Sequence, residues 1–116
     1  MTVPARILVV DDDPGSRMSL AGLLEDEGYA VEEAATVGAA REKLARQAFD
    51  LAILDRDLNG EDGLALLPAL REQHPEAKAV LLSGGSEPVQ AAIDARLIKG
   101  SPPDEMLETI AALLRS

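Results

Sequence analysis

Short apolar runs alternate along the chain with longer segments in which alanine and leucine recur at helical spacing. Apolar runs of strand length are predicted at 7–10, 29–35, 51–54, 79–82 and 97–98. Helices are predicted from 14 to near 28, over 37–47, after a polar turn at 59–63, and toward the end of the chain up to about 114. This alternation is typical of βα units on a parallel sheet that is buried on both faces. The fold class predicted is α/β.

Polar residues mark two of the predicted helix starts. Asp13 precedes Pro14, which suits an N-cap followed by proline at the first helical position. Ser101 with Asp104 resembles a capping box for the last helix. The residues expected to face the core are Leu20, Leu23 and Leu24, then Ala40 and Leu44, then Leu66, Leu67 and Leu70, and finally Leu107, Ile110 and Leu114 flanked by Met106 and Leu113.

The composition limits the classes of function. The 116 residues are 47% hydrophobic, which suits a single domain over 1–116. With 21 acidic and 11 basic residues the formal charge is −10, so neither nucleic acid nor an anionic membrane is an expected ligand. No cysteine is present, and no apolar run reaches the roughly 20 residues of a membrane-spanning helix. A cytoplasmic location is expected.

Polar side chains follow four of the predicted strands. The first strand ends on Asp11 and Asp12, the third on Asp55, the fourth on Ser83 and the fifth on Lys99. In an open parallel sheet, ligands bind at the carboxyl ends of the strands. Three carboxylates, a hydroxyl and an ammonium group are therefore expected to converge on one crevice.

Such a cluster of carboxylates needs a counter-charge. Two carboxylates about 4 Å apart repel by about 4 kcal/mol at an effective dielectric of about 20. All-oxygen ligands suit Mg²⁺, which accepts one or two carboxylates together with a phosphate oxygen. Phosphoryl transfer depends mainly on positioning and charge neutralisation, and an aspartate can be the nucleophile. The pattern thus predicts a magnesium site that handles a phosphoryl group.

Taken together, these motifs resemble the receiver domain of two-component response regulators, the CheY-like superfamily. The resemblance covers essentially the whole chain and is carried by ILVVDDDP, LAILDRDLNGEDG, AVLLSGG and LIKGSPPDEML. Each motif is weak alone, but their order and intervals are specific. The resemblance implies a doubly wound, five-stranded parallel sheet in the order 2-1-3-4-5, as in flavodoxin and CheY.

The resemblance also implies roles for single residues. Asp55 would accept a phosphoryl group from a histidine kinase or a histidine phosphotransfer protein. Mg²⁺ would be held by Asp12 and Asp55, by Asp11 through water, and by the backbone carbonyl of Asp57. Lys99 would pair with the phosphoryl oxygens, and Ser83 would donate to one of them. Phosphorylation would switch the loops after the fourth and fifth strands, without independent substrate turnover, toward an output domain or a partner protein.

Four departures from the family pattern stand out. Asn59 replaces a usual proline, and Gly100 replaces the proline that usually forms a cis bond after the lysine, so no cis bond is expected. Arg96 occupies the switch position that usually carries Tyr or Phe. The segment between Ser83 and Lys99 is short by about one and a half turns, which predicts a shortened fourth helix and a domain that does not use the usual dimer face.

Other readings of single residues and of the whole chain remain open. The Asp57 side chain is expected in solvent, Arg56 to be a gate or a surface residue rather than a catalytic group, and His74 in an exposed loop. The D-x-D in LAILDRDLNG also fits haloacid-dehalogenase-like phosphatases, but their second acidic pair follows that strand, whereas here it precedes it. A degenerate receiver, acting as a phosphorylation-independent interaction module, is the second alternative.

Overall fold

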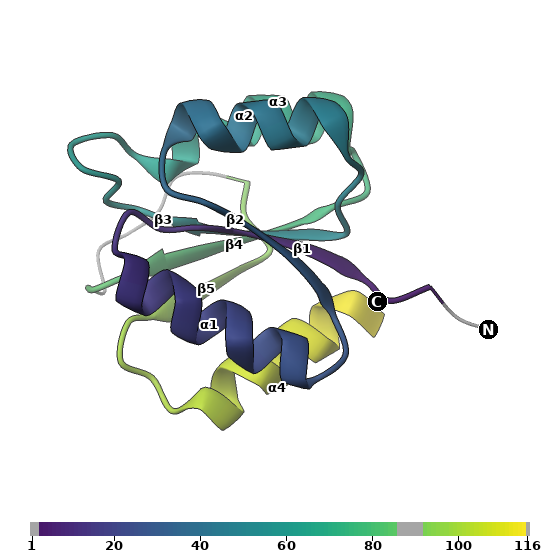
Figure 1. Cartoon of the computed structure of the whole chain (residues 1–116), viewed down its shortest axis with the longest axis vertical. Helices are drawn as coiled ribbons and strands as arrows, with labels where there is room; N and C mark the ends of the chain where they lie inside the picture. The colour runs from purple at the N-terminus through teal and green to yellow at the C-terminus, as the bar shows by residue number, and fades with distance from the viewer. Residues whose placement is uncertain (1–2, 86–91, 116) are drawn as a thin grey trace.

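The computed structural model describes residues 3–85 and 92–115. In this part of the chain, the elements follow one another as β1 (Arg6–Val10), α1 (Pro14–Asp26), β2 (Ala30–Ala34), α2 (Val37–Arg46), β3 (Leu51–Asp55), η1 (Gly63–Leu66), α3 (Leu67–Gln73), β4 (Lys78–Ser83), β5 (Ala95–Ile98) and α4 (Pro103–Arg115). The five strands pair in parallel in the order β2-β1-β3-β4-β5 (Figure 1). The predicted fold class and strand order are confirmed.

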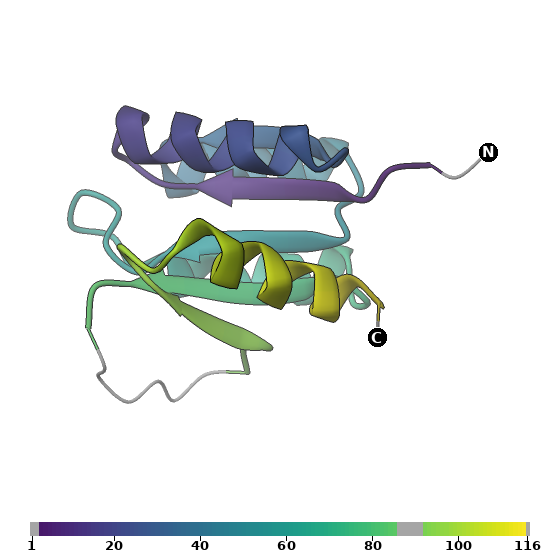
Figure 2. The same cartoon turned by 90° about the horizontal axis from the view of Figure 1, so that it is seen from below.

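The sheet is the middle layer of three. Helices α2 and α3 cover one face and α1 and α4 cover the other (Figures 1 and 2). Because side chains alternate along a strand, Leu8 and Val10 of β1 pack under α2 and α3, whereas Ile7 and Val9 pack toward α1 and α4. All four are fully buried. This alternation explains why β1 reads as one continuous apolar run.

The observed starts of α1 and α4 agree only in part with the predicted ones. Asp13 caps α1, its carboxylate accepting the amide of Ser16 at 2.8 Å, with Pro14 in the first turn as predicted. The prediction of a capping box at Ser101 is wrong, because α4 begins at Pro103, one residue later than that motif requires. The Pro102 carbonyl accepts the first helical amides instead.

Of the predicted inward positions, Leu23 and Leu67 are only partly buried, and so are Met106, Leu107, Leu113 and Leu114 around the buried Ile110. The last four pack against the α1/α4 side of the sheet, which favours core over partner contact for this stripe. The third helix is divided, because the 3-10 turn η1 precedes α3.

The predicted shortened fourth helix concerns the connection between β4 and β5, and most of that connection, 86–91, lies outside the described residues. The described parts of the connection, 84–85 and 92–94, contain no helix. Helix α4 is the C-terminal helix, so its label does not refer to this segment.

His74 was expected in an exposed loop, and this prediction is wrong. It ends α3 and is half-buried, with its Nε2 2.9 Å from the Leu44 carbonyl of α2. Its ring meets the buried Phe49 edge to face, with centroids 6.1 Å apart. His74 therefore joins α2 to α3, a contact between segments that no local pattern could reveal.

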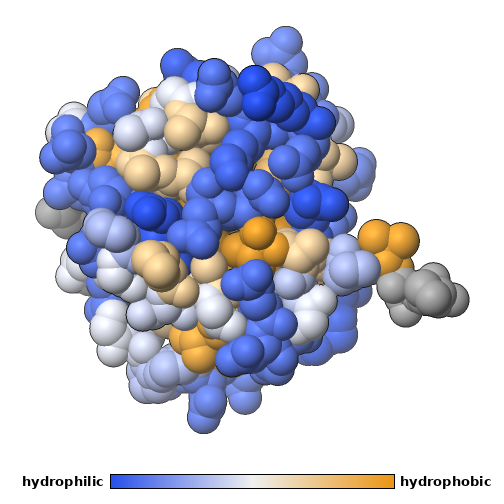
Figure 3. Space-filling view, in the orientation of Figure 1, coloured by the Kyte–Doolittle hydropathy of each residue, from blue (hydrophilic) through white to orange (hydrophobic). Residues whose placement is uncertain are grey.

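The face of the molecule in the orientation of Figure 1 presents mainly polar residues (Figure 3). The face in Figure 3 is mostly hydrophilic, with small and scattered apolar areas. In the described residues, no helix has both the length and the apolar character needed to cross a bilayer.

Candidate functional site

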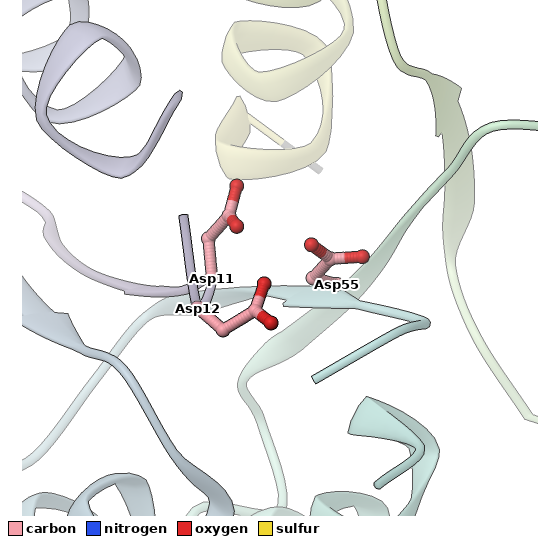
Figure 4. Close-up of side chains that lie close together, drawn as sticks. All are labelled: Asp11, Asp12 and Asp55. Carbon is pink, nitrogen blue, oxygen red and sulfur yellow. The ribbon is translucent and has the colours of Figure 1, made fainter. Parts of the chain in front are cut away.

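Three carboxylates meet at the carboxyl edge of the sheet. Asp11 and Asp12 directly follow β1, and Asp55 is the last residue of the neighbouring strand β3. One oxygen from each lies within 4.8 Å of the others (Figure 4). Asp11 and Asp55 are only 2% and 1% exposed, whereas Asp12 faces outward more. Strand pairing thus brings together residues that lie 44 positions apart.

Backbone amides hold two of these carboxylates in place. The amide of Asp13 donates to Asp11 at 2.9 Å, and that of Asp57 donates to Asp55 at 3.0 Å. Arg17 of α1 donates to the Asp11 carbonyl at 2.9 Å and pairs with Glu33 of β2 at 3.0 Å. The sequence analysis missed Arg17, because its partners become neighbours only in the folded sheet.

The electrostatics show an excess of negative charge. Burial raises the pKa of Asp11, and the adjacent Asp55 carboxylate raises it further, against the opposing effects of the Asp13 amide and Lys99. Carboxylates this close repel by about 3 to 4 kcal/mol per pair at an effective dielectric of about 20. The site therefore favours a further positive charge.

Lys99 supplies one cation. It follows β5, and its Nζ lies 2.9 Å from each carboxylate oxygen of Asp55. Burial lowers the pKa of Lys99, but the hydrogen bond and charge of Asp55 and the charges of Asp11 and Asp12 outweigh it, so the pKa is raised. Lys99 is therefore firmly an ammonium ion. No cis peptide bond occurs among the described residues, and Gly100 has φ 86°.

Ser83 lies at the same edge but has another partner. It is 7% exposed at the end of β4, and its hydroxyl donates to the Gly85 carbonyl at 3.0 Å. Its predicted bond to a phosphoryl oxygen requires this contact to break. Arg96 lies in β5, two residues before the strand end and partly buried. Its role as a switch stays a prediction.

The loop between β3 and η1, residues 56–62 and here called the β3–η1 loop, closes through a tight turn. Asn59 and Gly60 have φ 57° and 95°, the two positive values of a type I′ turn. Leu58 and Glu61 exchange hydrogen bonds of 2.7 and 3.1 Å across it. Proline could not adopt φ 57°, so Asn59 fits this turn where the usual proline would not. Asp57 is exposed as expected, and Arg56 pairs weakly with Asp62 at 3.8 Å.

Gly63, which follows this loop, is a site residue that the sequence analysis missed. It is buried against the main chain of Asp55, and a Cβ at this position would collide with the Asp55 carbonyl oxygen. The only sequence signal was a glycine at the end of a polar turn, which alone does not indicate a close approach.

The comparisons with known proteins agree with this geometry. The family model of the response regulator receiver domain matches residues 7–111. The chain therefore belongs to the response regulator receiver family, in which the fold is CheY-like.

Individual response regulators are similar to this chain in sequence and in structure. The chain is 37% identical over 108 residues to the alginate biosynthesis transcriptional regulatory protein AlgB of Pseudomonas aeruginosa, covering 87% of this chain and 24% of that protein. The chain thus spans about a quarter of that curated relative. A CheY-like receiver domain protein from Methanospirillum hungatei superimposes with a TM-score of 0.90 at 34% identity, covering 97% of this chain and 95% of that one. The response regulator TrrA of Thermotoga maritima, in complex with Mg(2+)-BeF, gives a TM-score of 0.84 at 33% identity, covering 94% and 98%.

Proposed function

We propose that this domain accepts a phosphoryl group on Asp55 from a phosphohistidine of a histidine kinase or phosphotransfer protein. The observation that carries the proposal is the placement of Asp55. Its carboxylate is 1% exposed, lies against the Lys99 ammonium at 2.9 Å, and shares the strand edge with two further carboxylates. A nucleophile, a cation and a set of hard oxygen donors are the components of phosphoryl transfer.

The donor set fits Mg²⁺. The three carboxylate oxygens within 4.8 Å are hard ligands that carry excess negative charge. The pKa of Asp11 is raised, first by burial and then by the adjacent Asp55 carboxylate. Asp12 and Asp55 would bind the metal directly, Asp11 through water, and the Asp57 carbonyl would complete the protein ligands. When bound, Mg²⁺ would neutralise charge on the carboxylates and the phosphoryl oxygens. The Mg(2+)-BeF complex of TrrA supports this assignment by similarity.

The residues of the chain then have separate tasks. A carboxylate oxygen of Asp55 forms a bond to phosphorus while the phosphorus–nitrogen bond of the donor histidine breaks, leaving the electron pair on the ring nitrogen. The ammonium group of Lys99 then leaves the Asp55 carboxylate and pairs with the new phosphoryl oxygens. The Ser83 hydroxyl breaks its hydrogen bond to the Gly85 carbonyl and donates to one of these oxygens instead. This exchange moves the loop after β4, and phosphorylation adds nearly two negative charges that bias the loops after β4 and β5.

The output is proposed from the relatives. AlgB is named as a transcriptional regulatory protein, and this chain covers only a quarter of it. We propose that residues 1–116 form one receiver domain that acts on an output domain or on a partner protein.

Intact mass after incubation with acetyl phosphate and Mg²⁺ tests the proposal. We expect one labile phosphate adduct in the native chain and none in Asp55→Ala. Asp57→Asn is the matched control, because the Asp57 side chain is exposed in the same loop and only its backbone carbonyl is assigned a role. An adduct that persists in Asp55→Ala would contradict the assignment. Absence of any adduct with every donor would favour the degenerate, phosphorylation-independent module.

A further inference from the structure

The β3–η1 loop contains the sole asparagine of the sequence, and a glycine follows it. We propose that Asn59 is a site of spontaneous deamidation, and that its conversion to aspartate and isoaspartate impairs the phosphoacceptor site. The second half of this proposal rests on the function proposed above. The first half does not, since it concerns only the chemistry of the turn.

The reaction is an attack of the main chain on a side-chain amide. The Gly60 nitrogen forms a bond to Cγ of Asn59, its proton is lost, and the side-chain nitrogen leaves as ammonia. Water then opens the resulting succinimide at one of its two carbonyls, giving aspartate or isoaspartate without oxidant or reductant. Glycine favours the attack because no side chain shields its nitrogen or restricts its dihedral angles.

The turn leaves both reacting groups accessible. Asn59 and Gly60 are exposed, and the loop projects from the body of the domain beyond the end of β3 (Figure 1). Within the described residues, no group hydrogen-bonds the Asn59 side chain. The Gly60 amide reaches only Asp57 Oδ1 at 3.5 Å, longer than a normal hydrogen bond of about 2.7 to 3.2 Å. A Cβ placed on Gly60 would meet nothing within 4 Å, so the side of the turn where a side chain would project is open.

The protection of the native turn is small. Two hydrogen bonds between Leu58 and Glu61 hold it closed, and the Leu58 side chain anchors one end in the core. Opening the turn breaks these two bonds and the long contact between the Gly60 amide and Asp57, and local opening that breaks so few contacts has a low free energy. The attack is therefore slowed by the turn but not prevented.

The product changes the geometry near Asp55. Isoaspartate adds a methylene group to the main chain of a segment that is held on both sides, at Leu58 by burial and at Gly63, two residues past the turn, by its contact with the Asp55 carbonyl. The same loop positions the Asp57 amide that donates to Asp55. Either product also adds a carboxylate to a loop that already carries Asp57, Glu61 and Asp62. We expect the isoaspartate form to take phosphate about tenfold more slowly, because a misplacement of about 1 Å can reduce a rate by up to about 100-fold.

The experiment ages the native chain in mildly alkaline buffer and follows intact mass and charge. Asn59 is the only asparagine, but the sequence also has three glutamines, whose deamidation would give the same mass gain and the same added negative charge. The gain is therefore assigned to Asn59 by its absence from a variant that lacks this amide. Asn59→Gly is the matched control, since Gly-Gly keeps both positive φ values and has no side-chain amide. A free peptide with the sequence of the turn sets the time scale. The aged fraction separated by ion exchange, the unaged chain and Asn59→Asp are then compared in the acetyl phosphate assay.

We expect the native chain to gain the mass more slowly than the peptide, but measurably by the time the peptide is fully converted, and Asn59→Gly to gain none. We also expect the isoaspartate fraction to lose most of its phosphorylation rate. A native chain that stays unchanged after the peptide is fully converted would overturn the proposal, and so would an isoaspartate fraction that is phosphorylated as fast as the unaged chain. If the unaged chain takes no phosphate, the proposed function fails, whereas the mass gain still decides the modification.

Discussion

Acidic side chains lie at both edges of the sheet, in opposite surroundings. At the amino edge, Asp50 precedes β3 and accepts the Arg6 amide of β1 at 2.8 Å. Asp94 precedes β5, accepts the Ala79 amide of β4 at 2.7 Å and pairs with Arg71 at 3.2 Å. Burial raises the pKa of Asp94, but the Ala79 amide and Arg71 lower it more, and the net pKa is lowered. These carboxylates join neighbouring strands and stabilise the fold.

At the carboxyl edge, the carboxylates face one another instead. Asp11, Asp12 and Asp55 share one cation, Lys99, and the pKa of Asp11 is raised. The carboxylates of the amino edge are thus each bonded to an amide or an arginine, whereas the three at the carboxyl edge share one ammonium group. The contrast indicates that the candidate site is recognised by carboxylates that the folded chain neutralises only in part.

The largest effect is expected where the carboxyl edge has no spare space. Gly63→Ala should destabilise the domain by about 1 to 3 kcal/mol and reduce phosphorylation of Asp55, because the new Cβ collides with the Asp55 carbonyl. Urea unfolding and the acetyl phosphate assay measure the two effects. Gly22→Ala is the matched control in α1, where a Cβ meets nothing within 4 Å. It should stabilise by about 0.5 to 1 kcal/mol. Equal stability of the two variants would contradict the packing at Gly63.

The next effect tests the amino edge. Asp94→Ala should lower the free energy of unfolding by about 1 to 2 kcal/mol, because it removes a charge-assisted bond to the Ala79 amide at a partly exposed position. It should leave phosphorylation of Asp55 unchanged, since Asp94 lies at the opposite edge. Chemical unfolding of the variant against the native chain decides the matter, and an unchanged stability would mean that Asp94 is not a structural carboxylate.

The pH dependence of Asp94 has a definite sign. A carboxyl group whose folded pKa lies below its unfolded value of 3.8 stabilises the fold above that pH, and this contribution is lost as the pH falls through the folded pKa. The native chain should therefore lose more stability on acidification below about pH 4 than Asp94→Asn does. If the stability of the two proteins changed in parallel with pH, the lowered pKa of Asp94 would be contradicted.

The smallest effect has the opposite sign. In metal-free buffer, Asp12→Asn should stabilise the domain by about 1 kcal/mol, because it removes repulsion with Asp11 and Asp55 that exceeds the lost attraction to Lys99. Thermal unfolding in a chelating buffer measures this change. A loss of stability would place Asp12 with the structural carboxylates of the amino edge.

The sequence was enough to predict the fold and the meeting of Asp11, Asp12, Asp55 and Lys99. Four short apolar runs ending on polar residues allow this, because parallel strands deliver their last residues to one edge. The N-cap at Asp13 could also be predicted, since capping depends on neighbours within one turn.

The remaining features depend on contacts between distant segments. Gly63 touches Asp55, Asp94 bonds Ala79, and His74 contacts Leu44, and no local pattern encodes these pairs. The capping box at Ser101 failed for a related reason, because the motif was present but α4 begins at Pro103.

Thermal unfolding with and without Mg²⁺ tests the central claim, that the carboxyl edge is a site for a cation and the amino edge is not. At about ten times its dissociation constant, Mg²⁺ should stabilise the native chain by about 1.4 kcal/mol. For a domain of this size that corresponds to a rise in melting temperature of roughly 4 to 8 °C. Asp94→Asn should show the same rise, and Asp12→Asn should lose most of it. An equal rise in Asp12→Asn, or none in the native chain, would contradict the account.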